Sequence, residues 1–357
     1  MNNRRVFIGV FASLLFFYLI FWIPRPGLWL KGDLCLLTML FGQARIDFGN
    51  LWQTLLHIKI IPLIVCFLIT PLHVLIRSYR WILLIKPIGK LKIYDSYSIQ
   101  MVSYFTSATM PLRIGEVVKG VLLSRQIQTS KSTALATVVL ERLIDIICMM
   151  ILVVLVGFLY SFPTEIKNGI IFLNISIGIG VLVLFYFTLA KDPFDNVIGN
   201  FLRIIPGGLG SKLIGIIIRF TRGFAALKSR KDYLFVIIES ISLWILYGLQ
   251  HLLIIYAFHF HIDYSFIAAS PLLVSFILLA INSAGLSIPS APGGVGTFHA
   301  VCIFSLALFG VGADPAAGFA LVIHATTYLF YIFCGIPFMI REGLKIGHLR
   351  QMRLNNG

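Results

Sequence analysis

Long apolar segments recur along this chain of 357 residues, and the charged residues gather mainly in the stretches between them. A helix of about 20 apolar residues is long enough to cross the roughly 30 Å of hydrocarbon in a bilayer. By length and scarcity of charge, the pattern predicts spanning helices at residues 6–23, 60–78, 133–160, 169–190, 233–257, 264–288 and 316–340.

Two further apolar stretches, 96–111 and 298–311, are short for a full crossing. Each adjoins a motif of prolines, glycines and polar residues, which indicates half-helices or re-entrant segments. The predicted fold class is therefore all-α: a polytopic integral membrane helical bundle with about 7–8 spanning helices plus broken or re-entrant short helices. We expect one transmembrane domain at residues 1–345 and a short basic cytoplasmic tail at 346–357.

Composition strengthens the membrane interpretation. Hydrophobic residues make up 59% of the chain and charged residues 12%, a balance with which a water-soluble protein of this size cannot cover its surface. The first apolar segment follows Arg4 and Arg5 and has no small-residue cleavage site at its end, so we interpret it as a retained helix rather than a signal peptide. The cysteines lie far apart without disulfide or metal-binding spacing, and we expect no metal and no cofactor.

The net charge of +15 comes from 29 lysines and arginines against 14 acidic residues. The basic residues flank apolar segments instead of forming one solvated face, which argues against nucleic acid as a partner. They cluster at residues 4–5, 77–92, 191–231 and 341–353, as lysine and arginine do in cytoplasmic loops. We therefore expect a multi-pass protein of the cell (inner or plasma) membrane with both termini cytoplasmic. The apolar spacing over residues 211–227 also predicts a helix lying on the cytoplasmic surface.

The first segment with candidate chemistry is Pro-Leu-Arg-Ile-Gly-Glu-Val-Val-Lys at residues 111–119. Arg113, Glu116 and Lys119 recur every third residue, so on a helix that starts after Pro111 they share one face and can form ion pairs. Pro111 ends the preceding apolar helix, and the amides that begin the next helix face the break. This geometry suits an anion such as phosphate.

A second charged segment lies inside a predicted spanning helix. Glu141 and Asp145 are four residues apart and face the same way, while Arg142 points to an adjacent face. Charges at membrane depth need partners, and Arg113 and Lys119 are the nearest cationic candidates in sequence. We infer one mutually neutralising network between the two segments. The alternative is a structural cluster of ion pairs at the cytoplasmic edge of the membrane.

The third segment, Ser-Ile-Pro-Ser-Ala-Pro-Gly-Gly-Val-Gly-Thr-Phe-His at residues 287–299, predicts irregular backbone between two apolar helices. Gly293, Gly294 and Gly296 allow backbone amides to approach a ligand closely. Thr297 is positioned to cap the following helix. No Lys-Ser or Lys-Thr pair follows the glycines, so the segment is not a Walker loop. A plain helix break without a ligand explains the glycines equally well.

Two histidines lie in or near this segment. His299 opens the short helix, and His324 lies inside the last predicted span. Each histidine is either a hydrogen-bonded structural group or a group that binds ligand or relays protons. Both can reach one cavity, and Asn282 and Ser283 in the preceding helix add polar groups nearby.

Taken together, the segments Pro-Leu-Arg-Ile-Gly-Glu-Val-Val-Lys, Glu-Arg-Leu-Ile-Asp and Pro-Ser-Ala-Pro-Gly-Gly-Val-Gly-Thr-Phe-His resemble the lysylphosphatidylglycerol synthase transmembrane-region family, often called flippase-like. The resemblance spans residues 5–345, and the Arg80–Trp81 pair also fits it. It implies a multi-helix membrane domain associated with translocating or presenting lipids, among them aminoacylated phospholipids and, in relatives, glycan or isoprenoid lipids. The motif positions that it carries over as a functional set are Arg113, Glu116, Glu141, Arg142, Asp145, Pro292, Gly293, Gly294 and Gly296.

The chain departs from the family pattern at the two histidines. Many relatives place Glu where this chain has His299, and Arg where it has His324. The resemblance therefore implies that His299 and His324 keep the contact of the Glu and Arg that they replace, while the substrate or the proton coupling differs from that of these relatives. In bifunctional relatives a soluble aminoacyl-transferring domain follows the membrane domain; this chain stops at Gly357, and we expect that it does not aminoacylate lipid by itself.

We expect a transporter, not driven by ATP, that binds and translocates an anionic lipid or a lipid-linked substrate such as a phospholipid, glycan lipid or isoprenoid phosphate. In this hypothesis Arg113, Lys119 or Arg142 binds the headgroup while neighbouring carboxylates balance or relay charge. One alternative is a membrane enzyme acting on a lipid-phosphate, with Glu141 and Asp145 beginning a metal site. Another is a scaffold whose partner is a lipid- or glycan-modifying enzyme. The candidate substrate-binding residues are Arg113, Glu116, Lys119, Glu141, Arg142, Asp145, Gly293, Gly294, Gly296, His299 and His324.

Overall fold

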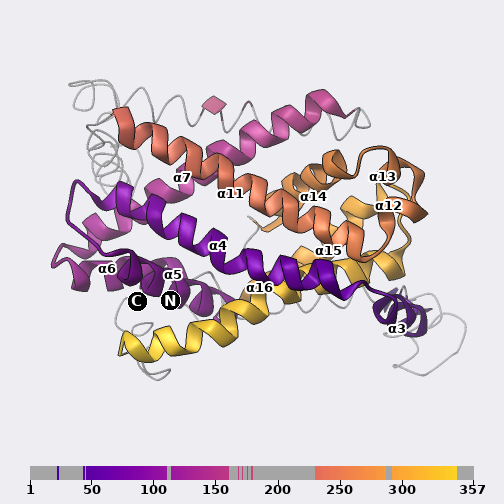
Figure 1. Cartoon of the computed structure of the whole chain (residues 1–357), viewed down its shortest axis with the longest axis horizontal. Coiled ribbons are helices and arrows are strands. Elements are labelled where there is room, and N and C mark those ends of the chain that lie inside the picture. The colour runs from indigo at the N-terminus through magenta and orange to yellow at the C-terminus, as the bar shows by residue number, and fades with distance from the viewer. Residues whose placement is uncertain are drawn as a thin grey trace, which may run out of the picture. The chain divides into compact units, whose positions relative to one another are not determined.

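The computed structural model describes residues 46–110, 114–160, 230–286 and 292–343, together with residues 22–23 and 43–44 and single positions between 168 and 179 (Figure 1). Within these residues the chain is helical apart from one short antiparallel pair, in which β1 (Trp22–Ile23) lies against β2 (Gln43–Ala44). The all-α expectation is confirmed for the rest of the described chain.

Four described helices are long and apolar enough to cross a membrane: α4 (Ile60–Ile85), α7 (Lys131–Leu159), α11 (Arg230–Ala257) and α16 (Ala313–Arg341). Each rises about 1.5 Å per residue, so their lengths of about 39–44 Å exceed the hydrocarbon thickness. They confirm the expected spans at 60–78, 133–160, 233–257 and 316–340. The expected spans at 6–23 and 169–190 and the surface helix at 211–227 fall largely or wholly outside the described residues.

The span expected at 264–288 is wrong as a single helix. The structure divides this region into α12 (Phe260–Asp263), α13 (Ser265–Ala269) and α14 (Pro271–Leu286). Proline has no backbone N–H to donate and disfavours helical backbone in the residue before it, and Ser270 accordingly has φ −153°. The apolar helix that remains, α14, has 16 residues.

The two short apolar stretches form short helices. The stretch at 96–111 belongs to α5 (Ile93–Thr109), and the stretch at 298–311 belongs to α15 (Thr297–Ala307), which follows a 3-10 turn at Pro292–Gly294. The helix expected after Pro111 is α6 (Gly115–Gln126). Whether either stretch is re-entrant stays a prediction.

The chain divides into two compact units. Unit 1 comprises residues 1–73, 101–115 and 245–357, and unit 2 comprises residues 74–100 and 116–244.

In unit 1, α14 packs on α15, α15 packs on α16, and α16 packs on α3 (Phe48–Leu56). Ile46, Leu51 and Ala317 form a buried cluster beneath α3. The start of α3 is also held by Asp314 of α16, which accepts hydrogen bonds from the Asp47 amide at 2.8 Å and from the Asn50 side chain at 3.3 Å.

The core of unit 2 joins three of the long helices. Leu83 and Leu84 of α4, Leu140 of α7 and Val236 of α11 form one buried cluster. A side chain at Gly120 of α6 would meet Leu135 of α7 at 2.5 Å, so α6 approaches α7 closely. These contacts bring the charged residues of α4, α6 and α7 within reach of one another.

Candidate functional site

Two arginines near the end of α4 are buried in unit 2. Arg77 and Arg80 are one turn apart, so they project from the same face of the helix. Arg77 is 5% exposed and Arg80 is fully buried. A buried arginine is stable only when its charge and its hydrogen-bond donors are matched.

The matching carboxylates come from α7. Arg77 donates from Nε to Glu141 at 2.6 Å and also binds Asp145. Arg80 donates to Asp145 at 2.6 Å and to the hydroxyl of Ser240 at 3.0 Å. Glu141 and Asp145 are one turn apart on α7, and this spacing allows them to serve both arginines.

Lys119 of α6 completes the buried part of this network. It is 3% exposed, forms an ion pair with Glu141, and places its ammonium 4.1 Å from the centre of the Trp81 ring. The Trp81 indole donates to Thr137 of α7 at 3.3 Å, and the Gln100 amide donates to Glu141 at the same distance. Lys119 thus has both an anion and an aromatic face as partners.

The outer edge of the network is more open. Arg142 of α7 binds Glu116 of α6 at 2.7 Å, and their side chains are 38% and 28% exposed. Arg142 also approaches Asp145, at 3.5 Å. The network therefore grades from the fully buried Arg80 to the partly exposed Arg142.

The predicted network between the two charged segments is confirmed, because Lys119 binds Glu141 and Glu116 binds Arg142. The predicted pairing along one helix is replaced by these contacts between helices. Arg113 lies outside the described residues, so its role stays a prediction. The assignment of substrate binding to the network also stays a prediction.

Sequence reasoning missed the principal partners of Glu141 and Asp145. Arg77 and Arg80 look like a basic flank at the end of an apolar segment, and we interpreted them as an orientation signal. The missed signal is their spacing of one turn within the 26-residue helix α4, before Trp81. That spacing places both guanidinium groups on one helical face.

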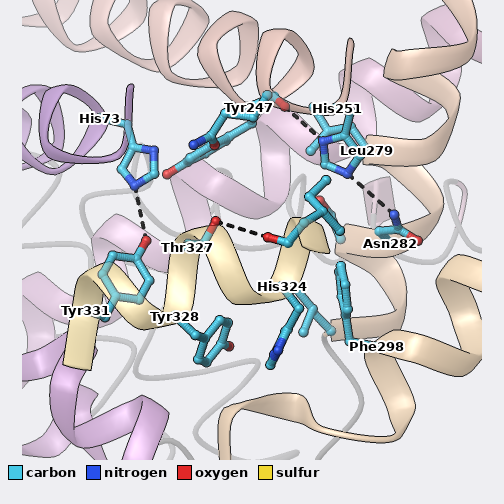
Figure 2. Close-up of a pocket in the computed structure, with 14 residues that line it drawn as sticks. His73, Tyr247, His251, Leu279, Asn282, Phe298, His324, Thr327, Tyr328 and Tyr331 are labelled. Atoms are coloured by element: carbon cyan, nitrogen blue, oxygen red, sulfur yellow. Dashed lines mark hydrogen bonds between the residues drawn. The ribbon is translucent and has the colours of Figure 1, made fainter. Parts of the chain in front are cut away.

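Unit 1 contains a cavity of about 200 Å³ among α4, α11, α14, α15 and α16 (Figure 2). Figure 2 shows aromatic rings and uncharged polar groups converging on it from these helices. The lining residues are His73, Tyr247, Gln250, His251, Leu279, Asn282, Ser283, Leu286, Phe298, Ile323, His324, Thr327, Tyr328 and Tyr331. Of the two histidines expected to reach one cavity, His324 lines it together with Asn282 and Ser283, whereas His299 is not among its lining residues.

The glycines before α15 shape the wall beside this cavity. Gly293, Gly294 and Gly296 have φ values of +68°, +73° and +87°, in the region that glycine adopts most readily. A Cβ on Gly293 would lie 2.8 Å from the Tyr328 ring, and the Gly293 carbonyl accepts a hydrogen bond from His324 at 2.9 Å. These contacts favour the helix-break interpretation, and ligand binding by the glycine amides stays a prediction.

The two histidines are in contact, as the family resemblance implies. The rings of His299 and His324 have centroids 5.0 Å apart. The helix cap differs from expectation: Gly296 occupies the cap position, Thr297 is the first helical residue, and the Gly296 amide donates to Nδ1 of His299 at 3.4 Å. Nδ1 is therefore an acceptor, and the buried Nε2 of His299 has no partner among the described residues.

The described residues include no group of three His, Cys, Asp or Glu side chains placed to hold a metal ion. Glu141 and Asp145, which we considered as the beginning of a metal site, instead form ion pairs with basic side chains of this chain. Arg77 and Lys119 bind Glu141, and Arg77 and Arg80 bind Asp145.

Comparison with known proteins places these features in a family context. The family model described as Lysylphosphatidylglycerol synthase TM region matches residues 10–335. A UPF0104 membrane protein of Methanocaldococcus jannaschii is 25% identical over 239 residues, which are 67% of this chain and 94% of that protein. No solved structure matches the chain.

Proposed function

Because the chain belongs to the Lysylphosphatidylglycerol synthase TM region family, we propose that it is a membrane transporter that binds and translocates an anionic lipid or lipid-linked substrate. The observation that carries the proposal is Arg142, whose side chain is 38% exposed at the edge of an ion network in which the other cations are buried. The network lies on helices of which α4 and α7 are long enough to span the bilayer.

Charge inside an apolar helix is costly, and such residues usually mark substrate pathways or relays. In this network the buried cations are committed to carboxylates: Arg77 and Arg80 to Asp145, and Lys119 to Glu141. Arg142 differs because it is open to solvent or ligand on one side. A guanidinium is also the side chain best matched to a phosphate group, which it binds with two parallel hydrogen bonds.

The binding step that we propose is an exchange of partners. A lipid phosphate competes with Glu116 for Arg142, and the exposed Glu116 carboxylate, at 28%, gains water in return. Asp145 keeps Arg142 near the site, since it lies 3.5 Å from that guanidinium while held by the buried arginines. Paired charges beneath the site thus position Arg142 without binding the lipid themselves.

The test is headgroup translocation of fluorescent short-chain phosphatidylglycerol in proteoliposomes, with Arg142→Gln compared with the parent. A charge-assisted pair contributes about 1.5–3 kcal/mol, so we expect translocation to fall about 10-fold or more. Lys86→Gln is the matched control, because Lys86 is 60% exposed and pairs with Asp232 outside the network. We expect that variant to transport within about twofold of the parent.

Two outcomes contradict the proposal. Parent-like translocation by correctly inserted Arg142→Gln protein removes Arg142 from the pathway. Chemical conversion of the lipid without its movement favours instead a membrane enzyme that acts on a lipid-phosphate.

A further inference from the structure

The cavity of unit 1 differs in chemistry from the ion network. None of its described lining residues is an Asp, Glu, Lys or Arg. Its polar groups are two amides, hydroxyls and imidazoles, and its largest surfaces are aromatic rings (Figure 2). A charged ligand would find no counter-charge among these described residues, and burying an unpaired charge is strongly unfavourable.

The hydrogen bonds of His251 fix it as a neutral group. Its Nδ1 lies 2.9 Å from the Tyr247 carbonyl, which only accepts, so Nδ1 carries the proton. Its Nε2 then accepts from the Asn282 amide at 3.4 Å. The Ser305 hydroxyl, which donates to the Cys302 carbonyl at 2.8 Å, lies 3.5 Å from the Asn282 oxygen.

The aromatic rings are held in place by one another. Tyr328 stacks on His324 with centroids 4.0 Å apart, and Tyr331 stacks on Tyr104 at 4.4 Å with an interplanar angle of 8°. The Tyr331 hydroxyl and His73 Nε2 form a hydrogen bond of 3.1 Å. Such rings offer rigid apolar faces, and little conformational entropy is lost when a ligand lies on them.

We propose that this cavity binds an uncharged, hydroxyl-rich ring, that is, a single sugar residue. A pyranose has a face of C–H groups suited to aromatic rings and a rim of hydroxyls suited to amides, imidazoles and other hydroxyls. A cavity of about 200 Å³ holds one such ring and not a phospholipid. An acyl chain fits the rings but forms no hydrogen bond with the hydroxyls, amides and imidazoles of the wall.

This inference goes beyond the proposed function and does not depend on Arg142, since the cavity belongs to unit 1 and the ion network to unit 2. An adjacent feature is consistent with it. His299, beside the cavity-lining His324, keeps a buried Nε2 donor without a described partner.

The test is calorimetric binding of hexyl glucoside to the full chain in phosphatidylcholine nanodiscs, below the micellar concentration and against empty nanodiscs. Hexanol and hexyl phosphate have the same alkyl chain and serve as matched probes. We expect hexyl glucoside to bind at least 10-fold more tightly than either. We expect Tyr247→Leu and Thr327→Val each to weaken hexyl glucoside binding about fivefold or more.

Tyr256→Leu is the matched control, because Tyr256 lies on the same helix as Tyr247 but is 39% exposed outside the cavity. The proposal is overturned if hexanol or hexyl phosphate binds as tightly as hexyl glucoside, or if Tyr256→Leu weakens binding as much as Tyr247→Leu does. Thr327→Val nearly preserves side-chain volume, so it replaces Tyr247→Leu as the test if that variant does not fold. Binding of hexyl glucoside by Thr327→Val protein as tight as that by the parent would then overturn the proposal. Arg142→Gln protein should bind hexyl glucoside like the parent, which separates this inference from the transport proposal.

Discussion

Glu141 is the carboxylate on which the buried cations of unit 2 converge. Arg77 and Lys119 bind its two oxygens, Gln100 adds a further donor, and the side chain is 2% exposed. In so dry a position the attraction between charges is strong, but so is the cost of removing them from water. Removing the charge of Glu141 would therefore leave two buried cations with one fewer counter-charge, and this would lower the stability of the protein.

We predict that Glu141→Gln destabilises the protein by about 3–5 kcal/mol, because breaking a buried ion pair leaves an uncompensated buried charge. Thermal or denaturant unfolding in detergent measures the loss. Lys86→Gln breaks the exposed pair with Asp232 and is expected to cost about 0–1 kcal/mol. Equal stability of the Glu141→Gln protein and the parent would show that the network does not hold the fold together.

Individual residues also show how far sequence alone could reach. Lys119 and Glu141 were predictable partners, since charges beside or within apolar helices require neutralisation. Arg77 and Arg80 were not, because a basic residue near the end of an apolar segment is also what membrane orientation demands. Only the packing of α4 on α7 separates those two explanations.

At the scale of elements, the short helix α3 depends on its neighbours. It has nine residues, too few to be stable alone in water. Asp47 caps it by accepting from the Gly49 amide at 2.7 Å, and Asp314 of α16 accepts from the Asp47 amide. The first turn of α3 is thus stabilised both by its own N-cap residue and by a hydrogen bond to α16.

We predict that Asp314→Ala loosens α3 selectively. Loss of a capping interaction costs about 1–2 kcal/mol, so amide hydrogen exchange in α3 should accelerate about 5- to 30-fold. Exchange in the middle of α16 should not change. Mass-spectrometric exchange on peptides covering both helices gives the comparison, with exposed Asp263→Ala on α12 as the control. Unchanged exchange in α3 would show that the Leu51 packing and the Asp47 cap hold the helix without Asp314.

The elements also show which sequence signals suffice. The four long helices were predicted to within a few residues at most ends, because each has a long and nearly uninterrupted apolar run. The region 264–288 was mispredicted because hydrophobicity does not register the missing N–H of Pro271. Length and composition locate a helix, whereas backbone chemistry decides whether it continues.

At the scale of the whole molecule, each long helix has more basic residues near one end than near the other; α4 has Lys59 at its start, and Lys86, Lys90 and Lys92 follow its end. Lys131 and Arg230 begin α7 and α11, and Arg341 ends α16. Cytoplasmic helix ends carry such residues more often than external ends do. On this basis we propose that these four ends face the cytoplasm.

We predict from this orientation that reporter fusions will alternate along the chain. Green fluorescent protein fused after Arg341 should be fluorescent, and alkaline phosphatase fused there should be inactive. Phosphatase fused after Tyr160 or Ala257, at the opposite ends of α7 and α11, should be active. An active phosphatase after Arg341 would reverse the orientation, and activity on both sides would contradict a single topology.

The ion network also has a consequence for biogenesis. Arg77 precedes its partner Glu141 by 64 residues, so α4 leaves the ribosome before α7 exists. At about 5–20 residues per second, the two arginines of α4 wait about 3–13 s for their counter-ions. Their place near the helix end allows their long side chains to reach the membrane surface during that interval. We expect the arrival of α7 to draw them inward, so a nascent chain arrested between the two helices would present unneutralised arginines to membrane quality control.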